Sequence, residues 1–285
     1  YAASASAPRR MAARRIAGPR AWGLLLAGSL PVLVGFVAPA AYLVVETAKR
    51  VRFAGISPLL LNGTLTTVTL ALAATALTLA AGLVVAYAAR LAPGRLSQVA
   101  TRTASLGYAV PGTVLAIGLL SPLIGLDYLL AGAAERWFGV SPGLLIMGSG
   151  LALVIAYSAR FLAIAVGGLE SGFARIPPAL DAVARTLGHA GGATLRRVHL
   201  PLIRPALAAA ALLVFVDCMK ELPATLLLRP LNTDTLATLL YAEAARGTYE
   251  DGAIAALLIV AVGLLPVILL ARVGEPERRP AHAAA

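Results

Sequence analysis

Charged residues and cysteine are both scarce in this sequence. Only 13% of its 285 residues are charged and 59% are hydrophobic, whereas a soluble domain is about a quarter charged and about half apolar. The single cysteine, Cys218, lies inside an apolar run, so a disulfide framework within the chain is excluded. This composition excludes an ordinary soluble domain and predicts an all-α integral membrane protein.

The sequence motifs of nucleotide and metal chemistry are also missing. No glycine-rich segment ends in Gly-Lys-Ser or Gly-Lys-Thr, the pattern that holds nucleotide phosphates in a P-loop. No group of His, Cys and carboxylate residues has the spacing of a metal site, and the histidines are His189, His199 and His282. We therefore expect a protein that is not an enzyme, with no catalytic residue, no metal site and no directly bound cofactor. We expect His199 to be a polar surface residue.

Six apolar runs are long enough for helices across a bilayer, which takes about 20 residues for each. If the N-terminus lies inside, the inner segments hold 16 of the 24 Lys and Arg residues and the outer segments hold 6. This bias predicts that both termini are cytoplasmic. The net charge of +11 is then explained by basic loops that orient the chain in the membrane, and it does not indicate a nucleic-acid partner. The expected spans are 21–45, 63–89, 105–126, 143–169, 203–228 and 252–271.

The two ends of the chain differ from its middle. Residues 1–20 hold five arginines among Ala, Ser and Pro. They predict a basic cytoplasmic linker, because the apolar run that follows is too long for the core of a signal peptide. Residues 273–285 are polar and rich in Pro and Ala, and they predict a disordered cytoplasmic tail. Residues 21–272 are predicted to form one transmembrane domain.

One polar segment interrupts the apolar pattern between the fourth and fifth expected spans. Residues 180–201 read LDAVARTLGHAGGATLRRVHLP. Asp181 and Arg185 stand four residues apart and so share a face of a helix, and Gly188 breaks that helix. A short amphipathic piece follows, and Leu200-Pro201 opens the next membrane helix. The segment is predicted to be a helix, a glycine turn and a second short helix at a membrane surface.

This segment resembles the signature loop of ABC-transporter permeases of the binding-protein-dependent importer type. That loop reads Glu-Ala-Ala, three residues, Gly, nine residues, an aliphatic residue, one residue and Leu-Pro. The motif glutamate is replaced here by Ala182, and Asp181 is the nearest acid. The residues at matching distances are Ala182-Val183-Ala184, Gly188, Val198 and Leu200-Pro201.

The resemblance implies that this coupling loop, residues 171–201, docks into a groove on a cytoplasmic ATPase subunit that binds the ATP. A type I importer permease fold and a periplasmic solute-binding protein as partner are implied in the same way. The alternative is a basic amphipathic helix that lies on lipid headgroups. The expected coupling residues are Asp181, Ala182, Ala184, Arg185, Gly188, Arg196, Arg197, Val198, Leu200 and Pro201.

Two further runs resemble the C-terminal half of the ferric-iron importer permeases, which are long two-repeat proteins of the bacterial inner membrane. The runs are LGYAVPGTVLAIGLL, residues 106–120, and MKELPATLLLRPLNTDTLAT, residues 219–238. This resemblance implies transport of ferric iron and a second permease half, either a fused N-terminal half or another copy. Sulfate, thiamine and polyamines are the alternative solutes. Within the first run, Pro111-Gly112 predicts a break in the helix.

Three charged residues fall in the fifth expected span, namely Asp217, Lys220 and Glu221. Each would cost about 3 kcal/mol at the centre of a bilayer, and their spacing places them near one helix face. Arg160 in the fourth span is the expected partner of the acids. We interpret the four residues as lining the path of a charged solute. A structural clamp between helices, the coupling site of a secondary transporter and an intramembrane catalytic pair are the alternatives.

Overall fold

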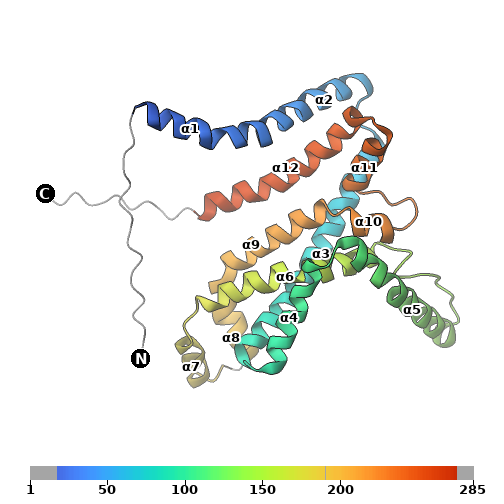
Figure 1. Cartoon of the computed structure of the whole chain (residues 1–285). Helices are drawn as coiled ribbons and strands as arrows, with labels where there is room; N and C mark the ends of the chain where they lie inside the picture. Colours follow the sequence, from blue (N-terminus) through green and yellow to red (C-terminus); the bar gives the residue numbers. More distant parts are fainter. Residues whose placement is uncertain (1–17, 190, 275–285) are drawn as a thin grey trace.

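The computed structural model describes residues 18–189 and 191–274, and every regular element within these two ranges is helical. The predicted basic linker and the predicted tail lie almost wholly outside the described residues. Figure 1 shows long helices in one bundle, with α7 and α8 near one end and α10 and α11 near the other. The elements are α1 (Pro19–Val32), η1 (Leu33–Val37), α2 (Ala38–Ala54), α3 (Pro58–Leu91), α4 (Arg95–Ala109), α5 (Gly112–Phe138), α6 (Leu151–Ala174), α7 (Ala179–Thr186), α8 (Gly191–Thr194), η2 (Leu195–His199), α9 (Leu200–Met219), α10 (Pro223–Leu228), α11 (Leu236–Arg246) and α12 (Tyr249–Gly274).

Helices of membrane-spanning length dominate the chain. In the part that the structure describes, five helical stretches are long and apolar enough to cross a membrane. α12 is a further long helix of 26 residues, or about 39 Å at 1.5 Å per residue. The predicted all-α membrane fold is confirmed. The five stretches are Pro19–Ala54, Pro58–Leu91, Gly112–Phe138, Leu151–Ala174 and Gly191–Met219.

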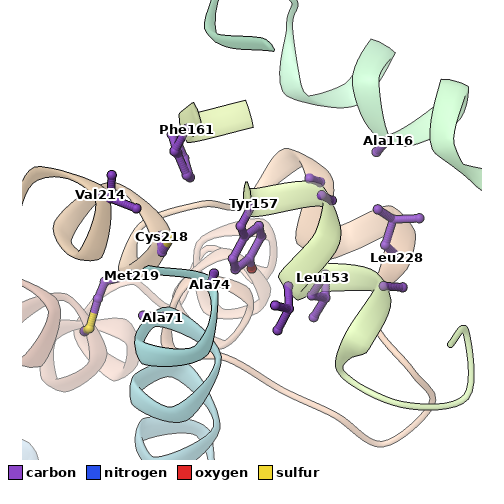
Figure 2. Packing of buried hydrophobic residues seen from close by; sticks show 14 of the residues in the cluster. Ala71, Ala74, Ala116, Leu153, Tyr157, Phe161, Val214, Cys218, Met219 and Leu228 are labelled. Carbon is purple, nitrogen blue, oxygen red and sulfur yellow. The ribbon is translucent and has the colours of Figure 1, made fainter. Parts of the chain in front are cut away.

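The centre of the bundle consists of α3, α6 and α9, which pack on one another. Small residues allow the close approach that helices need in a membrane: a Cβ added at Gly82 of α3 would lie only 2.7 Å from the Ala165 Cβ of α6. Figure 2 shows Tyr157 of α6 in this core together with Ala74 of α3 and Val214 of α9. This core therefore fixes the positions of α3, α6 and α9 relative to one another.

The first span is longer than expected. α1, η1 and α2 form one 36-residue stretch, and α2 packs along α12 (Figure 1). The expected end of this span at residue 45 is wrong, because Glu46, Lys49 and Arg50 are good helix formers and the helix continues to Ala54. Lys49 lies 2.7 Å from Glu46 one turn earlier, and Arg50 lies 3.1 Å from Asp251 on α12.

The third expected span, 105–126, is divided in two. α4 ends at Ala109 and α5 begins at Gly112, so the break predicted at Pro111-Gly112 is confirmed. The expected end of the span at residue 126 is wrong, since α5 continues to Phe138. Proline favours extended backbone in the residue before it, and Val110 is extended, with ψ of 132°.

A buried acid explains why the next connection is not where the sequence predicts it. Asp127 belongs to α5, and its side chain is buried. It accepts hydrogen bonds from the backbone N–H groups of Ile146 (2.7 Å) and Met147 (2.8 Å). These bonds hold residues 139–150 against the side of α5. The expected start of the fourth span at residue 143 is therefore wrong, and α6 begins at Leu151.

The fifth expected span is also misplaced. The helix begins at Gly191, passes through the π-helical turn η2 and ends at Met219. Leu200-Pro201 thus lies within a continuing helix and does not open one. Residues 220–222 interrupt the expected span before α10 begins, and α11 occupies part of the region beyond it that is polar in sequence.

Candidate functional site

The polar connector between α6 and α9 comprises residues 175–189 and 191–199 and lies at one end of the bundle (Figure 1). Gly188 ends α7 with a φ of +77°. Its N–H donates to the Arg185 carbonyl (3.0 Å), and the His189 N–H donates to the Ala184 carbonyl (2.9 Å). This pair of bonds is the glycine cap that closes many helices, in which the left-handed backbone favours glycine. The predicted helix followed by a glycine turn is confirmed.

The outer face of α7 carries exposed apolar residues. Val183 is 52% exposed and Leu187 is 68% exposed, with Ala182 and Arg185 exposed beside them. Ala184 faces the other way and is buried. Exposed apolar surface on a polar connector indicates contact with another protein or with a membrane. Of the other expected coupling residues, Arg196, Arg197 and Pro201 are exposed, and Val198 and Leu200 are half-buried.

Asp181, on the inner face of α7, contacts two other elements. Its Oδ2 accepts a hydrogen bond from Arg90 Nη2 in the last turn of α3 (2.6 Å). Its Oδ1 lies 2.9 Å from Nε2 of His199, which is an ion-pair distance without hydrogen-bond geometry. The carboxylate therefore bonds α7 to α3 and lies in contact with His199 at the base of α9.

The expectation that His199 is a surface residue is wrong. Its side chain is fully buried, with ring centroids 5.5 Å from Tyr87 and 5.7 Å from Phe173. His199 is the last residue of the π-helical turn η2. A π-turn holds one more residue than an α-helical turn, so a surface pattern drawn for an α-helix misplaces this side chain.

The last turns of α3 contribute two residues that the sequence reasoning missed. Arg90 donates to the carbonyl oxygens of Phe173 in the last turn of α6 (2.7 Å) and of Ile176 in the connector (3.2 Å). Tyr87 Oη donates to the carbonyl oxygen of Gly191 at the start of α8 (2.6 Å). These partners are 83 to 104 residues apart in the sequence, so no spacing pattern could have identified them.

A second polar group lies inside the bundle. Arg160 Nε lies 3.2 Å from Glu221 Oε2, and the Glu221 side chain is 6% exposed. Lys220, its neighbour in sequence, is 61% exposed and lies 2.8 Å from Asp217. The expectation that the three charges share one helix face is wrong, because α9 ends at Met219 and the chain turns there. The expected pairing of Arg160 with an acid is confirmed for Glu221.

This ion pair lies where two helix breaks meet, between α4 and α5 and between α9 and α10. Glu221 Oε1 accepts a hydrogen bond from the Ala224 N–H at the start of α10 (3.2 Å). At the start of α5, a Cβ added to Gly112 would overlap the Arg160 guanidinium and the Glu221 carboxylate. The glycine therefore lets the first turn of α5 approach the pair closely.

The bundle and its connector define a multi-pass helical membrane protein with a polar helix braced at one end. The chain belongs to the family described as binding-protein-dependent transport system inner membrane component, whose model matches residues 78–280. The resemblance stated from the motifs is confirmed at this level.

Two curated relatives resemble parts of the chain. One is the Fe(3+)-transport system permease protein FbpB 2 of Haemophilus influenzae, 31% identical over 163 residues that cover 57% of this chain and 29% of that protein. Another is PhnV of Salmonella typhimurium, named as a 2-aminoethylphosphonate transport system permease protein, 32% identical over 126 residues that cover 43% of this chain and 48% of that protein. The matched region is less than half the length of either relative.

Solved structures resemble the chain over more of its length. A crystal structure of a bacterial ABC transporter involved in alginate import has a chain with a TM-score of 0.66 and 15% identity, covering 90% of this chain and 96% of that chain. The MetNI methionine ABC transporter, in inward-facing conformations, gives a TM-score of 0.56 at 17% identity, covering 76% of this chain and 97% of that chain. At these identities the likeness shows the fold, which is that of ABC importer permeases.

Proposed function

We propose that the chain is the membrane-spanning subunit, or half of one, of an ATP-driven importer, and that α7 docks on a cytoplasmic ATPase subunit. One observation carries this proposal: α7 presents apolar residues outward while its inner face is hydrogen-bonded to α3 through Asp181 and Arg90. A helix held in this way moves with the bundle when a partner pushes on its outer face. ATP binds and is hydrolysed on the partner, and the family membership of the chain supports this division of labour.

The expected coupling residues divide into two roles in this proposal. Ala182, with Val183 and Leu187 beside it, provides the apolar contact surface. Arg185, Arg196 and Arg197 are exposed on the same connector and would favour an acidic contact surface on the partner. The second role is to position α7. It depends on the inner-face residues Asp181 and Ala184, on the cap residue Gly188, and on Val198, Leu200 and Pro201, which lie where η2 continues into α9.

We propose ferric iron as the solute, delivered by a periplasmic binding protein. The support is the similarity to FbpB 2 together with the two sequence runs that resemble ferric-iron permeases. The similarity to PhnV makes 2-aminoethylphosphonate a second candidate. Uptake of radiolabelled ferric iron and of 2-aminoethylphosphonate, measured side by side in proteoliposomes with the matching binding proteins, distinguishes the two. Transport of sulfate, thiamine or a polyamine, and of neither candidate, would reject both.

The Arg160–Glu221 pair is proposed to lie on the solute path. A mutually neutralising pair at the meeting point of two helix breaks can separate when the helices move, and it then presents charge to a solute. The exposed Lys220 is next to Glu221 in the chain, and its partner Asp217 lies one turn earlier. We propose an orientation in which the protein spans the bacterial inner membrane with both termini and the connector on the cytoplasmic side. α11 then lies on the periplasmic side. A second permease half completes the path.

Co-purification with the ATPase subunit tests the docking proposal directly. The complete permease carrying Val183→Asp and Leu187→Asp should lose the ATPase in detergent, because two charges would be buried at the contact. Leu231→Asp is the matched control, since Leu231 is exposed in the loop between α10 and α11. Loss in the double variant with retention in the control supports docking through α7. Retention in both would instead favour a helix that rests on lipid headgroups.

A further inference from the structure

α3 contacts the polar elements at both ends of the bundle, and we infer that it transmits the coupling motion across the membrane. Arg90 fastens its inner end to the connector, and Thr67 fastens its outer end to α11. The inference rests on the proposed function, because it names the helix that carries the motion α7 receives from the ATPase. Arg90 and Thr67 are positioning residues that act through the elements they hold.

The inner joint uses the planar guanidinium of Arg90. Its two terminal nitrogens donate to three oxygens: the Phe173 carbonyl in the last turn of α6, the Ile176 carbonyl in the connector, and Asp181 Oδ2 on α7. The guanidinium carbon also lies 5.9 Å from the centre of the Phe173 ring. A lysine ammonium is a single point charge and cannot reproduce this fork. The arrangement therefore makes the end of α3, the end of α6 and α7 one unit.

The contacts of Arg90 restrict the movement of α7 more than its two chain connections do. Next to α7, the chain passes through Pro177-Pro178 on one side and Gly188 on the other. The prolines fix φ on the first side, but Gly188 is permissive, so α7 could rotate at Gly188 without displacing α9. The Asp181 contacts remove that freedom, because separating the partly buried pair leaves Arg90 and Asp181 without their partners.

The outer joint is a single buried hydrogen bond at the start of α11. The Leu236 N–H, one of the donors that lack a partner within the helix, donates to Thr67 Oγ1 (2.7 Å). The same hydroxyl donates to the Gly63 carbonyl one turn earlier (2.6 Å), which orients its oxygen toward α11. A Cβ added at Gly63 would lie 2.7 Å from Leu239 Cδ1, so α11 lies directly against this turn of α3.

α3 is unbroken between the two joints, in contrast to the route through α9. From Thr67 to Arg90 it runs 23 residues, or about 35 Å. The route through α9 is interrupted after Met219, and α9 is preceded by the π-turn η2. A continuous helix packed along α6 and α9 moves as a rigid element. Displacement of the connector therefore reaches α11, on the side where the binding protein docks in the proposed orientation.

The test measures coupling in the complete permease, reconstituted with its ATPase and binding protein in proteoliposomes. Arg90→Gln and Thr67→Val each remove one joint. Their controls are Arg95→Gln, exposed at the start of α4, and Thr69→Val, whose hydroxyl bonds only within its own helix. Both joint variants should retain the ATPase and its basal hydrolysis. Stimulation by the loaded binding protein should fall by about 5-fold to 150-fold, the range of typical coupling energies.

Several outcomes would overturn the inference. One is that the binding protein stimulates ATP hydrolysis equally in Arg90→Gln and in its control Arg95→Gln. Another is that it stimulates hydrolysis equally in Thr67→Val and in its control Thr69→Val. If Arg90→Gln fails to fold, Arg90→Lys replaces it; this variant keeps the charge but loses the fork, and wild-type stimulation in it would also overturn the inference. Melting temperatures of all variants in detergent identify any loss that reflects unfolding.

A distance measurement separates this inference from the proposed function. Spin labels at Thr186→Cys on α7 and Val84→Cys on α3, both exposed sites, report the joint without any ATPase. The distribution of distances should broaden in the Arg90→Gln background and remain narrow with Arg95→Gln. An unchanged width would show that Arg90 does not hold α7, whether or not the ATPase binds. Failure of the wild-type permease to bind the ATPase would instead reject the proposed function, while an Arg90-dependent width would still show that Arg90 holds α7.

Discussion

Replacing Gly188 by alanine tests how the connector helix α7 is closed at its C-terminal end. Gly188 has a φ of +77°, and a Cβ built there meets nothing within 4 Å. Packing therefore contributes no penalty, and the whole cost is that of left-handed backbone in a residue with a Cβ. That cost is about 1–2 kcal/mol.

The penalty acts locally, because only α7 and the two hydrogen bonds of its cap depend on this conformation. Hydrogen exchange of the α7 amides measures the local opening that whole-protein melting would miss. A loss of about 1–2 kcal/mol should speed exchange by about 5-fold to 30-fold. Asparagine tolerates the left-handed region, so Gly188→Asn should exchange more slowly than Gly188→Ala.

Gly192→Ala is the matched control for this prediction. Gly192 lies in α8, its φ is not positive, and a Cβ there also meets nothing within 4 Å. Alanine should be neutral or stabilising at this helical position by about 0.5–1 kcal/mol. Equal exchange rates for the wild type and Gly188→Ala, or equal acceleration by both substitutions, would refute the reasoning from the backbone.

Three further predictions concern the bundle. Asp127→Asn weakens the bonds to the backbone of residues 146 and 147, so limited proteolysis should cut residues 139–150 faster than in a Glu135→Gln control; equal rates would contradict this. Glu221→Gln leaves Arg160 without its counter-charge and should lower stability in detergent by about 3–5 kcal/mol. The double variant with Arg160→Gln should lose less than the sum of the two single losses, and strict additivity would disprove the pairing. Gly82→Ala places a methyl group against Ala165 and should cost about 1–3 kcal/mol, whereas Gly118→Ala, with open space around it, should not lower the melting temperature.

The sequence alone determined the features that depend on local chemistry. Long runs without charge can only be membrane helices, so composition defines the class of protein. Proline fixes φ, and glycine accepts the left-handed backbone that other residues avoid. For this reason the break at Pro111-Gly112 and the end of α7 at Gly188 could be predicted, together with the helix that carries Asp181. The motif spacing in residues 180–201 then led to the correct family.

Charge was a poor guide to where helices end. Glu46, Lys49 and Asp127 mark loops when the sequence is read alone, yet each lies within a helix. In the folded chain these side chains have partners, either one turn away or on a distant segment. Lys220 and Glu221 show the opposite case, in which charged residues predicted to lie within one helix stand at its end. Because α9 stops at Met219, Lys220 is exposed whereas its neighbour Glu221 is buried.

Only the tertiary structure decided which polar residues act together. Arg90 meets Asp181 across 91 residues of sequence, and His199 becomes buried because Tyr87 and Phe173 enclose it. No local spacing encodes these contacts, because they exist only after α3, α6 and α9 have packed. In a membrane the packing itself depends on small residues, which carry little pattern in a sequence rich in alanine and glycine. The identity of the connector is therefore a property of the sequence, whereas its attachment to α3 is a property of the fold.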